Sequence, residues 1–473
     1  VSRLGRRALD SMSTLPDNHC LLYHGPRWMH QPIGECVSQR RFDCCQPQQD
    51  SNHRRPGHAR CHPLASRALS IRRSIRRRAG RVQVRAGDKA GPFFDGWFMR
   101  LTDPNAGLSI AVVLGLFWHG RSRGRADQGQ RPLDRGEQEH YLCVSVGSAA
   151  ERGQLASAHL FPDPATARLS VTTSSSESTR QGLRLPRRQA SAWAMPAMGL
   201  AELRYESEEH GLIAFGPSGA HSELRGRTRD GTPWSLEVHA EGALRPWSPE
   251  GWLGRLWRLG LLPCRYLVHT LYTPARYVLN APGGLCEGSP PISAAGSGTA
   301  HVETNFGEAF PDGWIYAQGH ASATTGDGPA FVLTGGRFRI GPLAPLTWLL
   351  CVRLPGEQPL AFRTTDLDAV RIRRLSFEDG EVALEAERPA WRGGGRGPRA
   401  SLRLRAPPDS FGSERLYVPT AAGFTREPGA AESFSAAAEL KVSGLAGGSE
   451  ASFSFPGCVL EFGGAFQNPL ECA

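Results

Sequence analysis

Residues 401–405 read Ser401-Leu402-Arg403-Leu404-Arg405, and this short stretch alternates polar and apolar side chains without a break. Successive side chains of a β-strand point to opposite faces, so such a stretch buries one face and exposes the other. Short segments of this kind, bounded by Gly, Pro and Asp, recur from residue 90 onward. The sequence therefore predicts a mainly β, antiparallel protein of the barrel or sandwich type.

The predicted strands share this composition and occupy residues 97–101, 108–114, 140–146, 167–172, 212–215, 234–239, 265–278, 314–318, 330–340, 346–354, 369–376, 382–386, 400–404, 437–442 and 451–462. One short amphipathic helix is expected at 251–262. Polar, Gly-rich or Ser-rich segments at 121–136, 169–192 and 282–299 are expected to be surface insertions.

The chain has 473 residues, a length that suggests two or three domains. With 40% hydrophobic and 21% charged residues, its composition excludes a coiled coil, a collagen and a wholly disordered protein. No apolar run approaches the ~18–20 residues of a membrane-spanning helix. We expect a disordered leader over residues 1–86, an N-terminal β-domain with loop insertions over 87–262 and a C-terminal β-domain over 263–473.

Positive charge is concentrated in the leader. Residues 1–86 carry 17 Arg, no Lys and 5 acidic residues, a net charge of +12, whereas the other 387 residues carry 38 basic and 40 acidic groups, a net charge of −2. We therefore expect no nucleic-acid partner. The Arg- and Ser-rich, acid-free segment 66–79 is typical of organelle-import leaders. It leads into Val84-Arg85-Ala86, which resembles the end of algal chloroplast transit peptides, and processing is expected there.

The eleven cysteines do not form the paired spacing of a zinc site or a disulfide framework. The nucleophile elbow, the His-Glu-x-x-His motif, the phosphate loop and the dinucleotide fingerprint are all missing from the sequence. We accordingly expect no metal and no cofactor.

Two clusters mix carboxylates with large aromatic residues. They read Pro92-Phe93-Phe94-Asp95-Gly96-Trp97-Phe98 and His301-Val302-Glu303-Thr304-Asn305-Phe306-Gly307-Glu308-Ala309-Phe310-Pro311-Asp312-Gly313-Trp314-Ile315-Tyr316. Asp-Gly is a common turn dipeptide, so Asp95 and Asp312 also fit a purely structural role. Glu303 lies inside an expected strand, where its side chain faces either water or an enclosed site. His301 is most simply a strand histidine with satisfied hydrogen bonds.

These clusters resemble a known family. Residues 93–98, Phe-Phe-Asp-Gly-Trp-Phe, are similar to the Phe-Phe-Glu-Gly-Trp-Tyr/Phe opening of tocopherol cyclases and their bacterial relatives. The block at 303–314 looks like that family's Glu-Lys-Asn/Asp-Trp-Gly…Phe-Pro…Trp block, and residues 459–464 lie near a family Glu-x-Gly-Gly. The resemblance runs in order over about residues 92–467 and is poor between about 120 and 230. Asp95, Thr304 and Phe306 replace the family's Glu, Lys and Trp.

The resemblance implies a lipocalin-like barrel and an isomerase of the intramolecular lyase type. Such an enzyme converts methyl- or dimethyl-phytylquinol to tocopherol by protonating a side-chain alkene, after which the phenol oxygen closes the chromanol ring. This chemistry needs a carboxylic acid that stays protonated near neutral pH, and burial among aromatic rings provides one. Water must also be excluded, because it would trap the cation.

On this reading the leading acids are Glu303 and Asp95, and the remaining site residues are Trp97, Asn305, Phe306, Trp314, Asp312 and Glu461. Asn305 would orient the quinol hydroxyl. The implied partners are a prenylated hydroquinone and, peripherally, plastid lipid droplets (plastoglobules) or the thylakoid membrane, which places the protein in the chloroplast. Two alternatives remain open, namely a non-catalytic isoprenoid-lipid carrier and a prenyl-lipid hydratase on the same scaffold.

Overall fold

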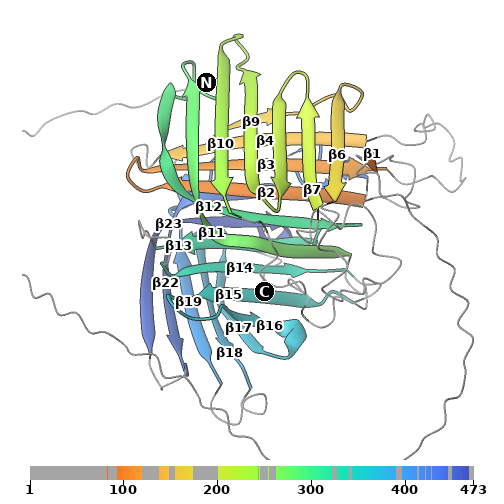
Figure 1. The fold of residues 1–473 in the computed structure, drawn as a ribbon. Helices are drawn as coiled ribbons and strands as arrows, with labels where there is room; N and C mark the ends of the chain where they lie inside the picture. Colours follow the sequence, from red (N-terminus) through yellow and green to blue (C-terminus); the bar gives the residue numbers. More distant parts are fainter. Residues whose placement is uncertain are drawn as a thin grey trace, which may run out of the picture. The chain divides into compact units, whose positions relative to one another are not determined.

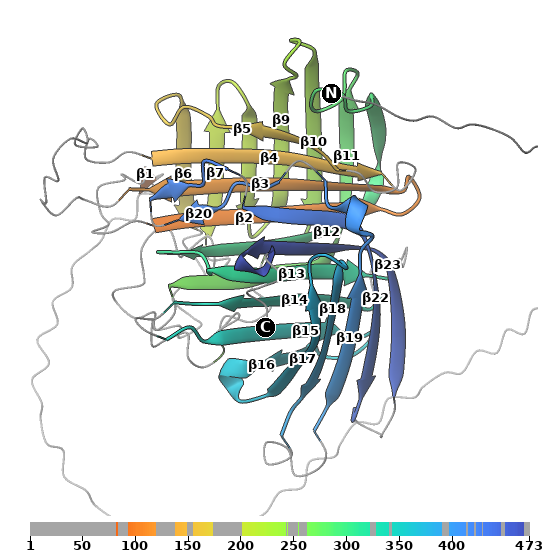
Figure 2. The same ribbon diagram turned by 180° about the vertical axis from the view of Figure 1, so that it is seen from behind.

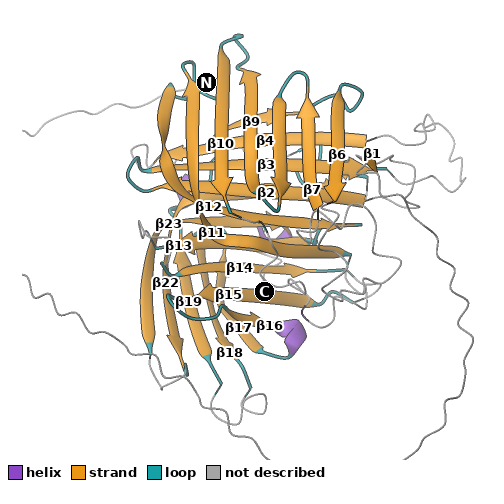
Figure 3. Ribbon diagram, viewed as in Figure 1, coloured by secondary structure: helices purple, strands orange, loops and turns teal. Residues whose placement is uncertain are grey.

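Antiparallel β-strands make up nearly all of the regular structure in this computed structural model (Figures 1 and 3). The structure describes residues 82–83, 93–119, 138–148, 155–173, 201–242, 244, 254, 263–321, 328–339, 343–389, 397–412, 415–420, 422–427, 429–445 and 450–467. Within these ranges no helix is long and apolar enough to cross a membrane.

The first sheet has twelve strands, and in spatial order they are β1 (Val82–Gln83), β6 (Ala167–Thr173), β7 (Ala201–Ser207), β8 (Gly211–Gly216), β9 (Gly219–Arg227), β10 (Pro233–Glu241), β11 (Cys264–Ala281), β12 (Ile292–Gly307), β2 (Phe93–Asp103), β3 (Leu108–Trp118), β4 (Gln138–Ser148) and β5 (Leu155–Leu160). Along the chain, β12 is the last strand of this sheet and β2 is one of the first, and the two are paired side by side.

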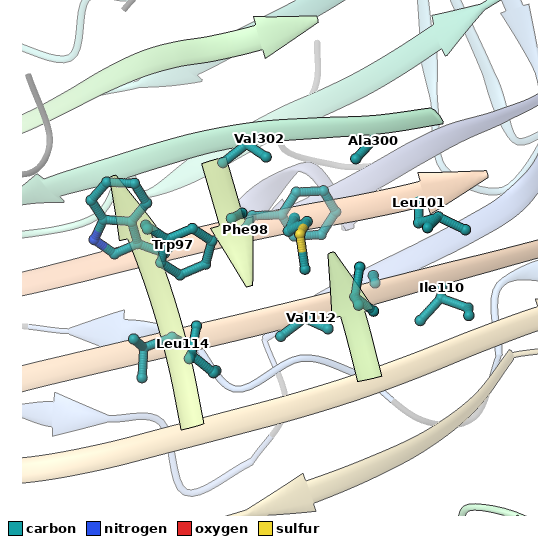
Figure 4. Packing of buried hydrophobic residues seen from close by; sticks show 14 of the residues in the cluster. Trp97, Phe98, Leu101, Ile110, Val112, Leu114, Ala300 and Val302 are labelled. Carbon is teal, nitrogen blue, oxygen red and sulfur yellow. The ribbon is translucent and has the colours of Figure 1, made fainter. Parts of the chain in front are cut away.

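The first sheet folds over itself, so that β7 to β10 cross β2 to β4 and β12 at a steep angle (Figure 1). The side chains of β10 alternate between exposed and buried, which gives this layer one wet and one apolar face. Figure 4 shows Trp97, Leu114 and Val302 in the packed interior between the layers. By contrast, β3 is buried along almost its whole length, and it is correspondingly apolar throughout.

The second sheet has nine strands, in spatial order β16 (Leu360–Arg363), β15 (Leu346–Arg353), β14 (Ala330–Arg337), β13 (Gly313–His320), β23 (Ala451–Gly464), β22 (Ala430–Ser443), β19 (Arg399–Arg405), β18 (Glu381–Glu387) and β17 (Ala369–Ser376). A short 3-10 turn, η4 (Thr364–Asp366), joins the two edge strands β16 and β17. The two sheets form a half-barrel and a nearly closed barrel, as a two-domain lipocalin-like β fold does.

Strand β13 is buried on both faces because it serves two cores. Ile315 and Ala317 pack in the interior of the second sheet, whereas Tyr316, which lies between them, packs in the core that includes the first sheet. The neighbouring strands β14 and β15 divide their side chains in the same way. One face of β2 and β12 thus meets one face of β13 and β23, as seen from behind in Figure 2.

The predicted fold class is confirmed. Every predicted strand overlaps an observed one. The strands β1, β5, β7, β9, β16, β20 (Pro419–Thr420) and β21 (Gly423–Phe424) had not been predicted, and β12 was expected only around Glu303. The expected insertion at 282–299 needs correction, since residues 292–299 begin β12 and pair with β11. These residues are mostly Ser, Ala, Gly and Thr, so they carry no apolar alternation that would reveal the strand.

The expected division at residue 263 falls inside the first sheet, because β11 and β12 pair there and the second sheet begins at Gly313. Apart from Val82–Gln83, which pair with β6, the expected leader 1–86 lies outside the described residues. The helix expected at 251–262, of which only residue 254 is described, and the insertion at 121–136 also lie outside the described residues.

Leu402→Ala should lower the free energy of unfolding by about 2–5 kcal/mol, because Leu402 is 1% exposed in the core of the second sheet. The neighbouring Ser401→Ala, on the exposed face of β19, should change it by no more than about 0.5 kcal/mol. Chemical denaturation of both variants measures the difference, and equal effects would contradict the assignment of faces.

Candidate active site

A cavity of about 110 Å³ lies between the two sheets. On one side, its walls come from β2, β3, β4, β11 and β12 of the first sheet. On the other side, they come from β13, β14 and β23 of the second sheet, and residues 416–419 and 424 complete the lining. Most of the lining is apolar, and aromatic rings dominate it: Phe94, Phe98, Phe310, Trp314 and Tyr316 all border the cavity. Phe98 meets Tyr316 edge to face across the two sheets, with ring centroids 5.6 Å apart.

Glu303 is the carboxylate that β12 contributes to this cavity, and it is 4% exposed. The hydroxyl of Tyr266 on β11 donates a hydrogen bond to Glu303 Oε2 over 2.5 Å. His301 Nε2 lies 2.6 Å from the same oxygen. Three side chains from neighbouring strands thus form one buried hydrogen-bonded cluster around this carboxylate.

The two tyrosines beside Glu303 remain hydrogen-bond donors. Burial raises the pKa of Tyr266 and of Tyr316 well above its usual range, and the charge of Glu303 raises both further. Each phenol therefore keeps its proton at neutral pH and presents an O–H group inside the cavity wall.

Glu461 faces Glu303 from the second sheet. It lies directly opposite Tyr316 in the pairing of β23 with β13, so both side chains point toward the first sheet. Burial raises the pKa of Glu461 to about 7, and the charge of Glu303 adds to this rise. The hydrogen bond that Trp314 Nε1 donates to Glu461 Oε1 acts in the opposite direction. A carboxyl that titrates near neutral pH therefore borders the cavity.

Arg100 places a buried positive charge at the boundary between the two sheets. Its guanidinium donates to Gln318 Oε1 over 2.8 Å, to Ser109 Oγ over 2.9 Å and to the carbonyl of Gly457 over 2.7 Å. It also lies over the ring of Phe434, 5.1 Å from the centroid. The side chain is 1% exposed and links β2 to strands of the second sheet. In the described part of the chain, no His, Cys, Asp and Glu side chains gather as a metal site would require.

Asp95 and Glu303 both border the cavity, but their side chains lie on opposite faces of the first sheet. Residues directly opposite each other in a sheet share a face, and Glu303 is paired with Phe98 whereas Asp95 is paired with Phe306. Thr304 Oγ1, which lies on the same face as the Asp95 side chain, is 3.4 Å from Asp95 Oδ1. Strand parity therefore separates the side chains of the two candidate acids. Because Asp95 lies within β2, the turn interpretation is corrected.

Trp97 and Phe306 occupy the same interior face as Asp95. Trp97 stacks between Phe215, at 4.6 Å, and His269, at 4.9 Å, so its ring belongs to the core of the first sheet. Phe306 is buried and lies 6.4 Å from Phe93 between ring centroids. Trp97 is among the residues that border the cavity. Both residues nevertheless lie on the opposite face from Glu303, because Trp97 is next to Phe98, the partner of Glu303, and Phe306 is three positions after Glu303.

Three of the remaining expected residues border the cavity and one does not. Asn305 shares the face of Glu303, and it fits because position 96 is a glycine, where a Cβ would lie 2.6 Å from Asn305 Oδ1. Trp314 and Glu461 line the cavity and are hydrogen-bonded to each other. Asp312 instead accepts a hydrogen bond from Arg339 Nε over 3.1 Å outside the lining.

Sequence reasoning did not identify Tyr266, Tyr316 or Arg100 as part of this site, and it assigned His301 only a structural role. Tyr266 lies 37 residues before Glu303, and only the pairing of β11 with β12 brings them together. The available signal was the charge of Arg100 between the apolar residues Met99 and Leu101 of β2.

A strap formed by residues 416–420 and 422–424 covers one side of the cavity. It contains the two-residue strands β20 (Pro419–Thr420) and β21 (Gly423–Phe424). The Phe424 N–H donates to Glu139 Oε2 over 2.8 Å. The Phe424 ring packs on Gly115, where a Cβ would lie 2.7 Å from it. A connection of the second sheet is thus seated on β3 and β4 of the first.

Comparison with protein-family models gives no match, and comparison of the sequence with curated proteins gives none either. Among solved structures, the chain is similar to a candidate AttH (NE1406) from Nitrosomonas europaea, with 12% identity, a TM-score of 0.40, and coverage of 78% of this chain and 92% of that one. It is also similar to CghA, with 11% identity, a TM-score of 0.44, and coverage of 79% and 88%. Kievitone hydratase from Nectria haematococca gives 10% identity, a TM-score of 0.35, and coverage of 80% and 92%.

The raised pKa of Glu461 predicts a pH-dependent loss of stability. The folded state holds the proton of Glu461 up to about pH 7, whereas the unfolded state releases it near the usual value of 4.5. Folding stability should therefore fall as the pH rises between these values, by at most about 3 kcal/mol from this group. Denaturation of Glu461→Gln across this range should show a weaker pH dependence than the wild type. Glu439→Gln, on the exposed face of β22, is the matched control and should follow the wild type.

Proposed function

We propose that the cavity is the active site of an acid-catalysed cyclisation, in which a phytylated hydroquinone is closed to a chromanol. The observation that carries this proposal is a pair of carboxyls, the buried Glu303 and the partly buried Glu461, on facing walls of an aromatic-lined cavity. The reaction is redox-neutral, and a proton donor, a proton acceptor and exclusion of water are sufficient for it.

Glu461 has the properties of the proton donor. With a pKa near 7, a substantial fraction of this carboxyl is protonated at neutral pH. Its O–H bond breaks as the proton forms a C–H bond at one alkene carbon of the substrate, and the electron deficit moves to the neighbouring tertiary carbon. General acid catalysis of this kind typically contributes about 10²–10⁴ in rate.

Glu303 has the properties of the proton acceptor. Its Oε2 already accepts the hydrogen bond of Tyr266 and lies beside His301, so its position is fixed. The quinol oxygen attacks the tertiary cation and forms the C–O bond, and its proton passes to Glu303. The protein as a whole then holds as many protons as before. Asn305, on the same face of β12, is within reach of a quinol hydroxyl bound beside Glu303.

The cavity walls suit a carbocation intermediate. Aromatic faces attract a cation by about 0.5–2 kcal/mol each, and Phe98, Phe310 and Trp314 present such faces. The apolar lining also keeps out water, which would otherwise give a tertiary alcohol. The cavity of about 110 Å³ is smaller than the roughly 150 Å³ that admits benzene, so a substituted quinol ring requires its walls to move outward.

Purified protein incubated with a phytylated quinol in D₂O tests the proposal directly. The cyclase yields a chromanol with one deuterium on the former alkene carbon. Recovery of a tertiary alcohol would instead identify a prenyl-lipid hydratase, and recovery of unchanged, bound substrate would identify a carrier. Either of these two results would overturn the cyclase assignment.

Substitution of the acids should separate their roles. Glu303→Gln should lower turnover about 10²- to 10⁴-fold, because it removes the proton acceptor while preserving size. Asp95→Asn should remain within a few-fold of the wild type, since Asp95 lies on the other face of β2. Steady-state chromanol formation measures both variants. Comparable losses in the two would mean that the face of the sheet does not decide which acid acts.

We also propose that the protein meets its substrate in the chloroplast, at the surface of plastid lipid droplets or of the thylakoid membrane. The support is the lipid nature of the proposed substrate together with the Arg-rich segment 66–79. Fractionation of plastids that import the full chain tests this, with recovery in a soluble fraction alone as the contrary result.

A further inference from the structure

Glu432, a residue that sequence reasoning did not select, lies directly opposite Glu461 in the pairing of β22 with β23. Glu461 is in turn opposite Tyr316, and Tyr316 is opposite Thr334 on β14. Because directly opposed residues share a face, one polar row crosses four strands of the second sheet and points toward the first sheet. Glu303 lies on the facing side.

Glu432 is buried, with 2% of its surface exposed. Within the described part of the chain, its Oε1 has no hydrogen-bond partner. A buried, ionised carboxylate normally has its oxygens paired, since desolvation of the charge is costly. The burial of Glu432 and the oxygen left unpaired among the described residues therefore favour the neutral, protonated form of this carboxyl.

Three charged groups on neighbouring strands act on Glu432. Arg100 on β2 is the positive group, and Glu461 on β23 and Glu303 on β12 are the negative ones. Tyr316 on β13 and Cys458 on β23 are further ionisable groups near Arg100, whose charge also acts on His320 of β13. The oxygens on β3, β13 and β23 that accept hydrogen bonds from Arg100 belong to neutral groups, and Glu432 is the carboxyl that acts on its charge through space.

We propose that Glu432 and Glu461 form an acid pair that shares one proton near neutral pH, and that Glu432 is the positioning residue that keeps Glu461 able to donate. Two adjacent carboxyls in a dry site cannot both be ionised cheaply, while Arg100 favours ionisation of one of them. The proton belongs to the pair rather than to either residue. In support, burial raises the pKa of Glu432 well above its usual range, and Glu461 adds to this rise.

The shared proton can be observed without any substrate. Infrared spectra of the full chain in D₂O should show a protonated-carboxyl band that persists to about pH 7, well above the usual carboxyl range. In Glu432→Gln and in Glu461→Gln, the remaining carboxyl should lose its proton about one pH unit lower or more, because its neighbour no longer carries a charge. Glu439→Gln on the exposed face of the same strand β22 should leave the band unchanged.

A band that is absent from the wild type, or that titrates identically in the wild type and both pair variants, would overturn the proposal. Because each pair variant tests the other residue, failure of one to fold leaves the second as the test. Urea unfolding of each variant establishes that it is folded.

The role of Glu432 in turnover rests on the proposed cyclase function. On that basis, the upper pH limit of chromanol formation should move down by about one unit in Glu432→Gln, giving about a tenfold loss at pH 8 and little loss at pH 6. An equal loss at all pH values would assign Glu432 a merely structural role. If the wild type forms no chromanol, the cyclase proposal fails, and the infrared titration still decides whether the acid pair exists.

Discussion

The site depends on the burial of one guanidinium, that of Arg100, between the two sheets. Arg100 projects from β2 and is held by groups on β3, β13 and β23, so it connects both halves of the molecule at their shared boundary. Desolvation of a guanidinium is costly unless negative charge lies near it. The presence of Arg100 thus makes it more favourable to keep Glu432 in this buried region, because its positive charge lowers the pKa of that carboxyl.

The chemistry of the cavity follows from which face of a strand each residue occupies. Glu303 and His301 are separated by two positions, so both point toward the second sheet, and Tyr266 reaches them from the next strand. Asp95 shares neither face nor partners with them, although its acid-aromatic context in sequence is as conspicuous. Two carboxylates with similar neighbours along the chain therefore lie in different interiors.

The sequence predicted the secondary structure better than the site because strand alternation is a local property, whereas pairing is not. The run at 401–405 shows its buried face directly, and it is found in β19. The small residues at 292–299 have no such alternation, yet they begin β12 because β11 supplies the pairing partner. Glu432 follows two alanines and precedes a serine, a context that looks like ordinary surface, and only the approach of β23 reveals its neighbour Glu461.

The alternation of β13 between two interiors has a mechanical consequence. Ile315 and Ala317 are packed into the far core, and the backbone that they fix is the same backbone from which Tyr316 projects beside the acids. Well-packed interiors transmit small displacements rather than absorbing them. The aliphatic side chains on the far side of β13 therefore help to fix the position of Tyr316 beside the acids, although they do not border the cavity themselves.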